Sequence, residues 1–317
     1  MSTSSSWFRR LHPWLGAAAF ALAAFLIWRA LRQYSLSEIR DSLSLISPRH
    51  LALGAAFTAA SFLCLTGFDT LAVRYTKSDL PYRKIALASF TALSIGHTLG
   101  FAAFSSGAVR YRFYTGWGLS AGDVARIIVF CGLTVLLGLC TAGGVSALIR
   151  PGLVAELFGI RPGAMIALGL LLLLLVAIYL GLAAVVQWPI RIRHFELPLP
   201  PLGLALGQVA VGTADFLLVA AVLHQMLSAS VEIAFFPVAM SYVAANTAAI
   251  LSHVPGGLGV IEAVVLSLVP GANVVGALIA FRVVYYLIPF VIGSVLFAAC
   301  EILRRHRRAT ANPQPSN

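Results

Sequence analysis

The sequence predicts an all-α polytopic integral membrane protein, and three observations lead to that fold class. Hydrophobic residues make up 60% of the 317 positions and charged residues only 10%, whereas soluble domains carry about 25% charged residues. The mean hydropathy is +0.92. Apolar runs recur along the chain at a length of roughly 17 to 25 residues, which suits a helix that crosses a bilayer. Residues 1–317 are therefore expected to form a single transmembrane domain.

The apolar runs predict about eight transmembrane helices, with boundaries uncertain by a few residues. In order, they lie near residues 14–28, 50–73, 85–104, 124–149, 162–188, 201–224, 233–252 and 272–300. The first run is expected to be an uncleaved span rather than a signal peptide, because no small-residue cleavage site follows it. Between the first two runs, Leu36, Ile39, Leu43 and Ile46 recur at helical spacing, which predicts a helix lying in the membrane interface.

The formal charge of +11 indicates orientation and contact with anionic lipid before anything else, and nucleic acid binding is the weaker interpretation. Basic residues occur in both tails, 1–12 and 304–317. Because positive charge tends to remain on the inner side, both termini are expected in the cytoplasm. Arg29, Arg32, Arg40 and Arg49 argue against this orientation, because the loop that carries them would then lie outside.

Two parts of the chain, about 50–150 and 201–303, resemble each other in the order of their features. Asp69, "HTLG" and "SSGAVR" follow one another in the first part, and Asp215, "NTAA" and "PGGLG" in the second. Each series ends in a glycine break, placed at Gly107 and Gly256, and a long apolar span follows. Paired glycine-interrupted segments indicate a transporter-type site near the bilayer midplane. The pattern leaves open whether the repeats are inverted or parallel.

The second break, "PGGLGVIE", has a direct physical interpretation. Pro255 ends the incoming helix, and Gly256, Gly257 and Gly259 allow backbone N–H groups to face outward. The helix that restarts presents its positive N-terminal end, which suits an anion. Glu262 lies one turn further on, so the site can also receive a cation. The alternative is a tight re-entrant turn that only packs.

A few charges lie within the predicted spans. Asp215 is in the middle of one span, and Arg282 lies in the last span with Tyr285 and Tyr286 on the same helical face. Each charge costs about 2.5 to 3.5 kcal/mol at the centre of a membrane helix, so each is expected to face a partner or water. Glu262 and Arg282 are natural partners by sign. Such a pair either serves a site or simply holds the bundle together.

The first break continues into "VRYRFYTGWG", in which Arg110 and Arg112 alternate with aromatic residues. Guanidinium groups bind phosphate while aromatic rings occupy the membrane interface, so this stretch fits a platform for lipid headgroups. A plain interfacial anchor is the alternative, above all for Arg112.

Enzymatic chemistry is weakly supported. Ser106 and His253 resemble the dyad of intramembrane serine proteases, but Phe104 stands where that motif has glycine. The cysteines and histidines show no metal-binding spacing and no phosphate-binding glycine loop occurs. The protein is expected to be no enzyme and to need no cofactor or metal.

Two stretches, "FSSGAVRYRFYTGWGLS" and "SHVPGGLGVIEAVVL", resemble the signatures of the lysylphosphatidylglycerol synthase transmembrane-domain family, the flippase half of the multiple peptide resistance factor. The resemblance spans roughly residues 12–303. It implies a bacterial inner-membrane protein that moves a phospholipid, typically aminoacylated phosphatidylglycerol, between leaflets. By position, the family's cavity-lining role would fall on Asp69, Arg112, Glu262 and Arg282.

The sequence departs from the long members of that family, which add further spans and a cytosolic synthetase domain. It is therefore not expected to make lysyl-lipid, and another anionic or polyprenyl lipid is an alternative substrate, as are hopanoid-related lipids of shorter relatives. A separate lipid-modifying enzyme and a second copy of the chain are possible partners.

The expected activity is lipid translocation without covalent chemistry. The arginines, residues 110, 112 and 282, would bind the phosphate, and the acids, residues 69, 215 and 262, would balance them or bind an amine. The rival hypothesis is a membrane scaffold in which these charges are structural.

Overall fold

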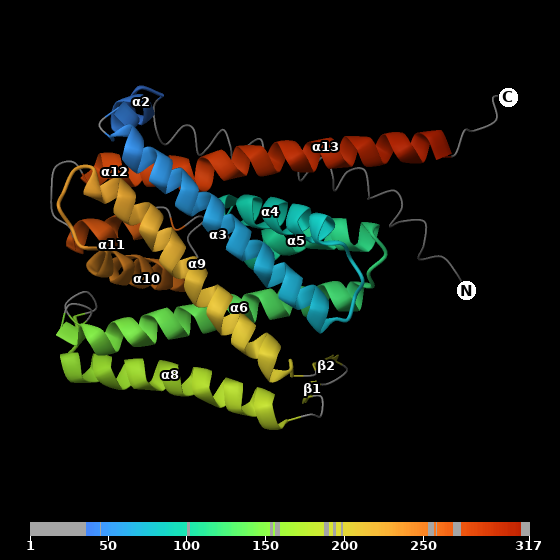
Figure 1. The fold of residues 1–317 in the computed structure, drawn as a ribbon, viewed down its shortest axis with the longest axis horizontal. Helices are drawn as coiled ribbons and strands as arrows, with labels where there is room; N and C mark the ends of the chain where they lie inside the picture. Colours follow the sequence, from blue (N-terminus) through green and yellow to red (C-terminus); the bar gives the residue numbers. More distant parts are fainter. Residues whose placement is uncertain are drawn as a thin grey trace.

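The computed structural model describes residues 36–44, 46–99, 102–152, 155, 159–186, 190–192, 195–197, 199–252, 257, 259–268 and 274–311. Nearly all of these residues are helical (Figure 1). A short antiparallel hairpin is the exception: β1 (Ile190–Ile192) pairs with β2 (Phe195–Leu197), with Ile190 opposite Leu197. The prediction of an all-α polytopic membrane fold is confirmed, apart from this hairpin.

Five helical runs in the described residues are long and apolar enough to cross a membrane. They are α3 (Pro48–Tyr75), α6 (Ala121–Ile149), α8 (Pro162–Val185), α9 (Leu202–Ser228) and the run Val274–Arg304. That last run comprises α12 (Val274–Phe281), the π-helix η2 (Arg282–Leu287) and most of α13 (Ile288–Ala311). All five correspond to predicted spans, because bilayer thickness sets the length of an apolar run.

Each of the two remaining predicted spans within the described chain belongs to a pair of adjacent shorter helices. The run at 85–104 divides into α4 (Tyr82–Leu99) and α5 (Ala102–Gly116), and the run at 233–252 forms α10 (Phe235–Ser252), with α11 (Val260–Leu268) beside it. An 18-residue helix such as α4 or α10 is about 27 Å long, slightly less than the bilayer core, and α5 and α11 are shorter still.

The position of the first break corrects the sequence prediction. Gly107 does not interrupt a helix but lies within α5, and the interruption falls between Leu99 and Ala102. A Cβ at Gly107 would lie 3.4 Å from the end of the Ile128 side chain of α6, an ordinary van der Waals contact. The second break lies between Ser252 and Val260, where it was predicted, although Gly256 itself is outside the described residues.

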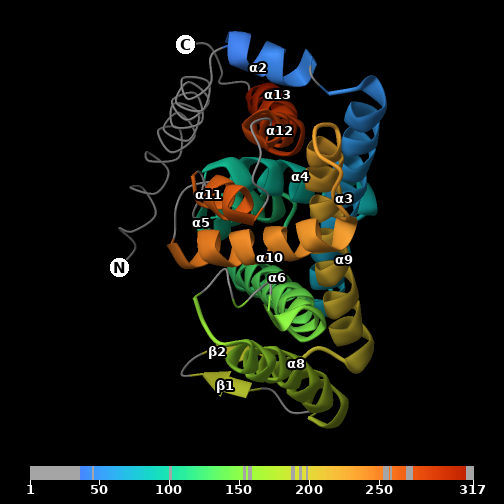
Figure 2. The ribbon, with the colours of Figure 1, turned by 90° about the vertical axis from the view of Figure 1, so that its left-hand side faces the viewer.

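Near the N-terminus, the helix predicted between the first two apolar runs is present as α2 (Leu36–Ser44) (Figure 2). The first predicted span, residues 14–28, lies outside the described residues.

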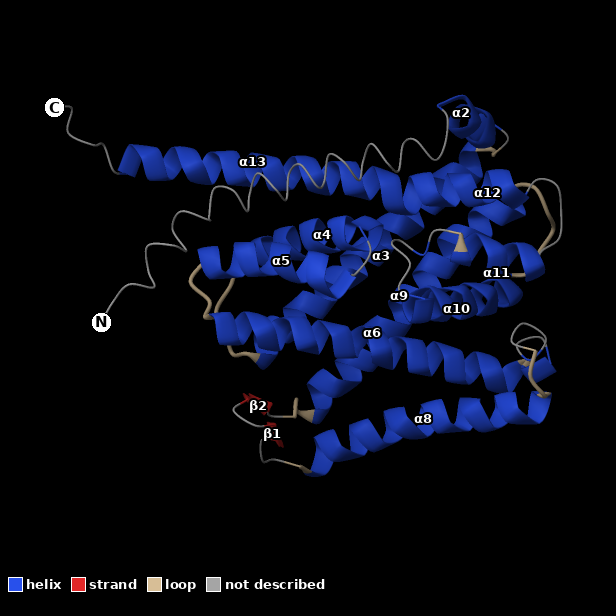
Figure 3. Ribbon diagram, turned by 180° about the vertical axis from the view of Figure 1, so that it is seen from behind, coloured by secondary structure: helices blue, strands red, loops and turns tan. Residues whose placement is uncertain are grey.

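The central helices α3 and α9 run in opposite directions. His50 bonds to Gln225, Ser61 to Asp215 and Cys64 to the Val211 carbonyl, so the partner's number falls as the chain advances. Each helix leads into a helix pair, and Figures 1 and 3 place α4–α5 and α10–α11 toward opposite ends of the molecule. This arrangement favours an inverted rather than a parallel repeat.

Helices α6 and α9 cross where two glycines meet. A Cβ on Gly138 would lie 2.4 Å from the carbonyl carbon of Gly212, and a Cβ on Gly212 would lie 2.5 Å from the backbone carbonyl oxygen of Thr134. Beside the crossing, the amide of Gln208 donates to the Phe130 carbonyl at 3.1 Å and to the Thr134 hydroxyl at 3.0 Å. Small residues let the backbones approach and the amide bonds then hold the pair. Figure 1 shows α9 passing diagonally across α6.

Gly138→Ala is expected to lower the free energy of unfolding by about 1 to 3 kcal/mol, because backbone atoms cannot yield to the added methyl group. Gly132→Ala on the same helix is the matched control, since its Cβ would meet nothing within 4 Å. Thermal unfolding in detergent measures both variants. Equal melting temperatures for the two would contradict the close crossing.

Candidate functional site

Glu262 closes the first turn of α11. The backbone N–H of Gly259, the residue before the helix, donates to Glu262 Oε2 at 2.9 Å. This is the glutamate half of a capping box, in which a side chain in the first turn satisfies an N–H that has no helical partner. Gly257 and Gly259 have φ of +60° and +77°, which glycine adopts readily. Gly257 and Gly259 therefore precede α11 in a conformation that lets Glu262 turn back toward the break.

Arg282 joins this break to the last membrane run. Its Nε donates to Glu262 Oε1 at 2.6 Å, and one Nη donates to Oε2 at 3.0 Å and to the Gly257 carbonyl at 2.9 Å. The guanidinium carbon also lies 4.8 Å from the centre of the Tyr286 ring, within cation–π range. The pairing of Glu262 with Arg282 predicted from their signs is therefore present.

The π-helix η2 meets the inner ends of both helix pairs. Arg282 reaches the second break, while the Tyr285 ring stacks on His97 near the end of α4, with ring centroids 6.2 Å apart. Such wide turns within α-helices are rare and frequently occur at functional sites. Two polar segments from opposite halves of the molecule thus converge on a single turn.

Asp215 lies close to the same turn but has a different kind of partner. Ser61 of α3 donates its hydroxyl to Asp215 Oδ1 at 2.5 Å, and the Ser61 oxygen is 3.3 Å from the Tyr285 hydroxyl. In the part of the chain that the structure describes, Asp215 takes part in no ion pair.

Asp69 and Arg110 form a closed and fully buried ion pair. Arg110 donates from Nε at 2.8 Å and from one Nη at 2.7 Å, and the Tyr114 hydroxyl donates to the same carboxylate at 2.7 Å. The side chains of Asp69 and Arg110 are 0% and 3% exposed. This pair links α3 to α5, and it makes no described hydrogen bond to Glu262 or Arg282.

Arg112 lies apart from both pairs, at the outer part of α5. It donates from Nε to Glu301 of α13 at 3.2 Å, with a second bond between the same two groups, and Arg304 donates to the Arg112 carbonyl at 3.0 Å. Lys84 lies 5.7 Å from the centre of the Trp117 ring nearby. The predicted basic and aromatic platform is therefore a contact region between α5, α4 and α13.

The predicted site residues thus divide into separate groups. Glu262, Arg282, Gly257 and Gly259 come together, with Asp215 reaching the same turn through Ser61. Asp69 pairs with Arg110, and Arg112 with Glu301. Sequence reasoning missed Ser61, Tyr114 and Glu301, of which only Tyr114 carried a local signal, one helical turn after Arg110. Of the weak serine protease dyad, Ser106 is buried and His253 lies outside the described residues.

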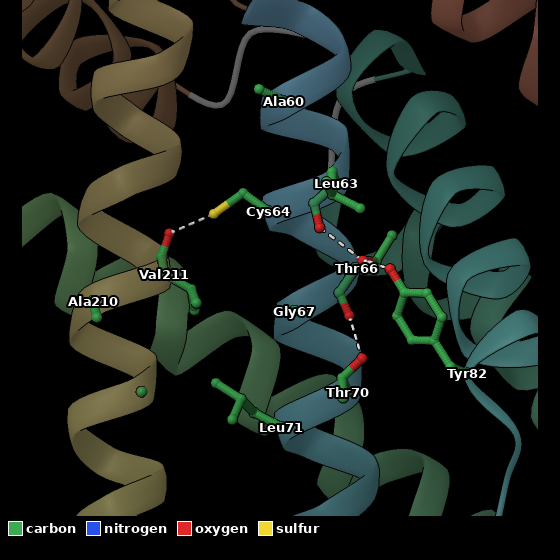
Figure 4. Close-up of a pocket in the computed structure, with 11 residues that line it drawn as sticks. Ala60, Leu63, Cys64, Thr66, Gly67, Thr70, Leu71, Tyr82, Ala210 and Val211 are labelled. Atoms are coloured by element: carbon green, nitrogen blue, oxygen red, sulfur yellow. Dashed lines mark hydrogen bonds between the residues drawn. The ribbon is translucent and has the colours of Figure 1, made fainter.

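An open apolar groove of about 550 Å³ runs along the outside of the α3–α9 contact. Figure 4 shows Cys64 directed across it toward the Val211 carbonyl, and the Thr66 hydroxyl beside Tyr82. None of the residues that line it is charged: Ala60, Leu63, Cys64, Thr66, Gly67, Thr70, Leu71, Tyr82, Gly207, Ala210 and Val211. Ser61 and Cys64 lie one turn apart on α3, so the side of the groove that Cys64 lines is close to the hydrogen bond between Ser61 and Asp215.

Comparison with known proteins finds bacterial relatives that match most of this chain. No protein-family model matches the sequence. It is 33% identical over 298 residues to the uncharacterised protein slr0712 of Synechocystis sp. (strain ATCC 27184 / PCC 6803 / Kazusa), a match that covers 93% of this chain and 92% of that protein. It is 26% identical over 289 residues to the inner membrane protein YbhN of Escherichia coli (strain K12), covering 89% of this chain and 86% of YbhN.

A more distant match is to the phosphatidylglycerol lysyltransferase of Staphylococcus aureus (strain COL), 23% identical over 297 residues. It covers 88% of this chain but 33% of that protein. These relatives support the broader part of the resemblance, a membrane family that includes YbhN and part of the lysyltransferase.

Asp69→Asn is expected to destabilise the protein by about 3 to 5 kcal/mol, because it leaves the buried Arg110 guanidinium without a counter-charge. The melting temperature in detergent measures the loss.

Asp123→Asn is the matched control for that change. The Asp123–Arg126 pair has an N–O distance of 3.2 Å and side chains 28% and 37% exposed, so its loss should cost no more than about 1 kcal/mol. A similar loss in both variants would show that the Asp69 pair is not the rigid element described here.

Proposed function

We propose that this chain, which belongs to the same family as slr0712 and is related to YbhN and phosphatidylglycerol lysyltransferase, is a membrane lipid translocator. It would bind a phospholipid headgroup between its two halves and let it cross while the acyl chains stay in the bilayer. The proposal includes no covalent chemistry.

The contact of η2 with the inner ends of both helix pairs carries this proposal. Non-helical backbone at membrane depth is tolerated only where protein or a water-filled cavity covers it. Here Arg282 bonds to the Gly257 carbonyl and Glu262 receives the Gly259 N–H. Opposed broken helices with polar groups at their ends are typical of transporters whose two halves move against each other.

The Glu262–Arg282 pair suits a headgroup that carries charges of both signs. A phosphate can replace Glu262 as the bidentate partner of the Arg282 guanidinium, and a released Glu262 can bind an amine. Aminoacylated phosphatidylglycerol offers both groups, and other anionic or polyprenyl lipids offer the phosphate alone. The apolar groove between α3 and α9 gives acyl chains a path beside the site.

The unequal distribution of basic residues between the two ends of the molecule predicts how it is oriented in the membrane. The outer ends of α3, α4, α5, α6 and α13 meet at one end (Figures 1 and 3). They carry Arg74, Lys77, Arg83, Lys84, Arg112, Arg126 and Arg304, and the opposite end carries Arg40, Arg49, Arg150 and Arg161. Since positive charge tends to remain inside, we place the first end and the C-terminus in the cytoplasm.

A second candidate function, a non-transporting membrane scaffold, is favoured by one observation. Each of Arg110, Arg112 and Arg282 already binds a carboxylate, as purely structural charges would. A charge swap of Glu262 and Arg282 does not separate the two functions, because it also removes the donor to Gly257 and the acceptor for Gly259. Variants that keep the size of the side chain and one of its hydrogen bonds separate the two functions better.

Asp79→Cys should be shielded from a membrane-impermeant maleimide in intact cells, and Arg161→Cys should react with it, because their exposed positions lie at opposite ends of the molecule. After permeabilisation both should react. The reverse pattern would place the basic end outside.

Arg282→Gln is expected to slow exchange of headgroup-labelled lysyl-phosphatidylglycerol in proteoliposomes by about 10- to 100-fold, since charged hydrogen bonds contribute roughly 1.5 to 3 kcal/mol. Phosphatidylglycerol is measured beside it, and Arg126→Gln, which breaks a surface pair, should match the wild type. Glu262→Gln keeps an acceptor for Gly259 and should slow the aminoacylated lipid more than the unmodified one. If the wild type exchanges neither lipid nor a polyprenyl phosphate above the protein-free rate, the scaffold function is favoured instead.

A further inference from the structure

Asp215 differs from the other acids that lie inside the helix bundle. Asp69, Glu262 and Glu301 each bind an arginine. Asp215 has the hydroxyl of Ser61 as its hydrogen-bond partner within the ranges described. A carboxylate without a counter-charge is costly in the middle of a membrane, whereas a protonated carboxyl group is not charged. Asp215 is therefore the acid best placed to gain and lose a proton.

Comparison of the two halves shows where a partner is missing. In the first half, Arg110 is the ninth residue of α5 and neutralises Asp69. In the second half, the ninth residue of α11 is Leu268, whose apolar side chain cannot neutralise Asp215. The repeat thus keeps the acid in both halves and keeps the arginine in only one.

Hydroxyl groups, instead of a cation, lie next to Asp215. Ser61 donates to Asp215, and the Tyr285 hydroxyl lies within hydrogen-bond distance of Ser61. Tyr285 stacks on His97, whose buried Nδ1 has no hydrogen-bond partner among the described residues. Such chains of hydroxyl and imidazole groups are the elements of proton relays in membrane proteins.

The other titratable groups near Asp215 are neutral donors. They are the thiol of Cys64 on α3 and the phenols of Tyr242 on α10 and of Tyr285 and Tyr286 on η2. Arg282 is the nearby cation of η2, and it is already bound to Glu262. No described element packed against Asp215 therefore supplies a salt-bridge partner.

We propose that Asp215 is a proton-binding site that couples lipid movement to the transmembrane proton gradient. The proposal rests on the proposed function and adds its energy source. A proton from one side adds to a carboxylate oxygen of Asp215 and leaves to the other side, with no covalent bond to the lipid. Because Ser61 joins Asp215 to Tyr285, the proton changes the contacts of the turn that also carries Arg282.

The experiment follows exchange of labelled lysyl-phosphatidylglycerol in proteoliposomes, with and without an imposed gradient of about two pH units, while a trapped dye reports internal pH. Such a gradient changes proton occupancy up to about 100-fold between the two sides, so we expect about tenfold faster exchange with accompanying proton flux. Asp215→Asn keeps the size and hydrogen bond of the side chain but cannot ionise. It should exchange lipid at one rate with or without the gradient, and exposed Asp79→Asn should behave as the wild type.

Ser61→Ala tests the link from Asp215 to Tyr285. It removes the hydroxyl that joins them and keeps the carboxylate, so it should lose the response to the gradient as Asp215→Asn does. Asp215→Glu, which can still ionise, should retain a response. Equal loss in Asp215→Asn and Asp215→Glu would assign Asp215 a structural role, and an undiminished response in Asp215→Asn would equally overturn the proposal. Wild-type exchange that is fast but indifferent to the gradient would overturn the proton site and leave the lipid translocator standing. Absence of exchange under every condition would remove both.

Discussion

The backbone that interrupts the second helix pair must find hydrogen-bond partners inside the membrane, and the arrangement around it follows from that need. Arg282 and Glu262 provide the partners through the Gly257 carbonyl and the Gly259 N–H. To reach the break, Arg282 has to lie on a membrane-spanning run and point inward. The same wide turn presents Tyr285 to Ser61 and His97. The need to hydrogen-bond the interrupted backbone thus brings together residues from α3, α4, α11 and η2.

Close helix contacts allow this convergence. Gly138 and Gly212 bring α6 onto α9 with backbones in contact, and α9 lies antiparallel against α3. Without an apolar driving force between helices in lipid, such packing and interhelical hydrogen bonds hold the bundle. The two helix pairs can then enter from opposite ends and meet η2.

Much of the fold was predictable from sequence, because bilayer thickness sets the length of apolar runs and proline with glycine marked the second break. The first break was misplaced at Gly107, because a glycine within a helix and a glycine that ends a helix look alike without tertiary context. The Glu262–Arg282 pair was predicted from the opposite charges of two residues in apolar segments. The Asp69–Arg110 and Arg112–Glu301 pairs did not, because their partners are far apart in sequence and the arginines had been assigned to a ligand.

Burial distinguishes which of these pairs can change partners. The Asp69 and Arg110 side chains are 0% and 3% exposed, and Tyr114 adds a third hydrogen bond, whereas Glu262 is 19% exposed. Separating charges that water and ligands cannot reach costs about 3 to 5 kcal/mol per broken pair. A partly open pair can exchange one anion for another without passing through an uncompensated state. The first pair therefore fixes α3 to α5, and the second is the pair at which the proposed exchange of a carboxylate for a headgroup phosphate would occur.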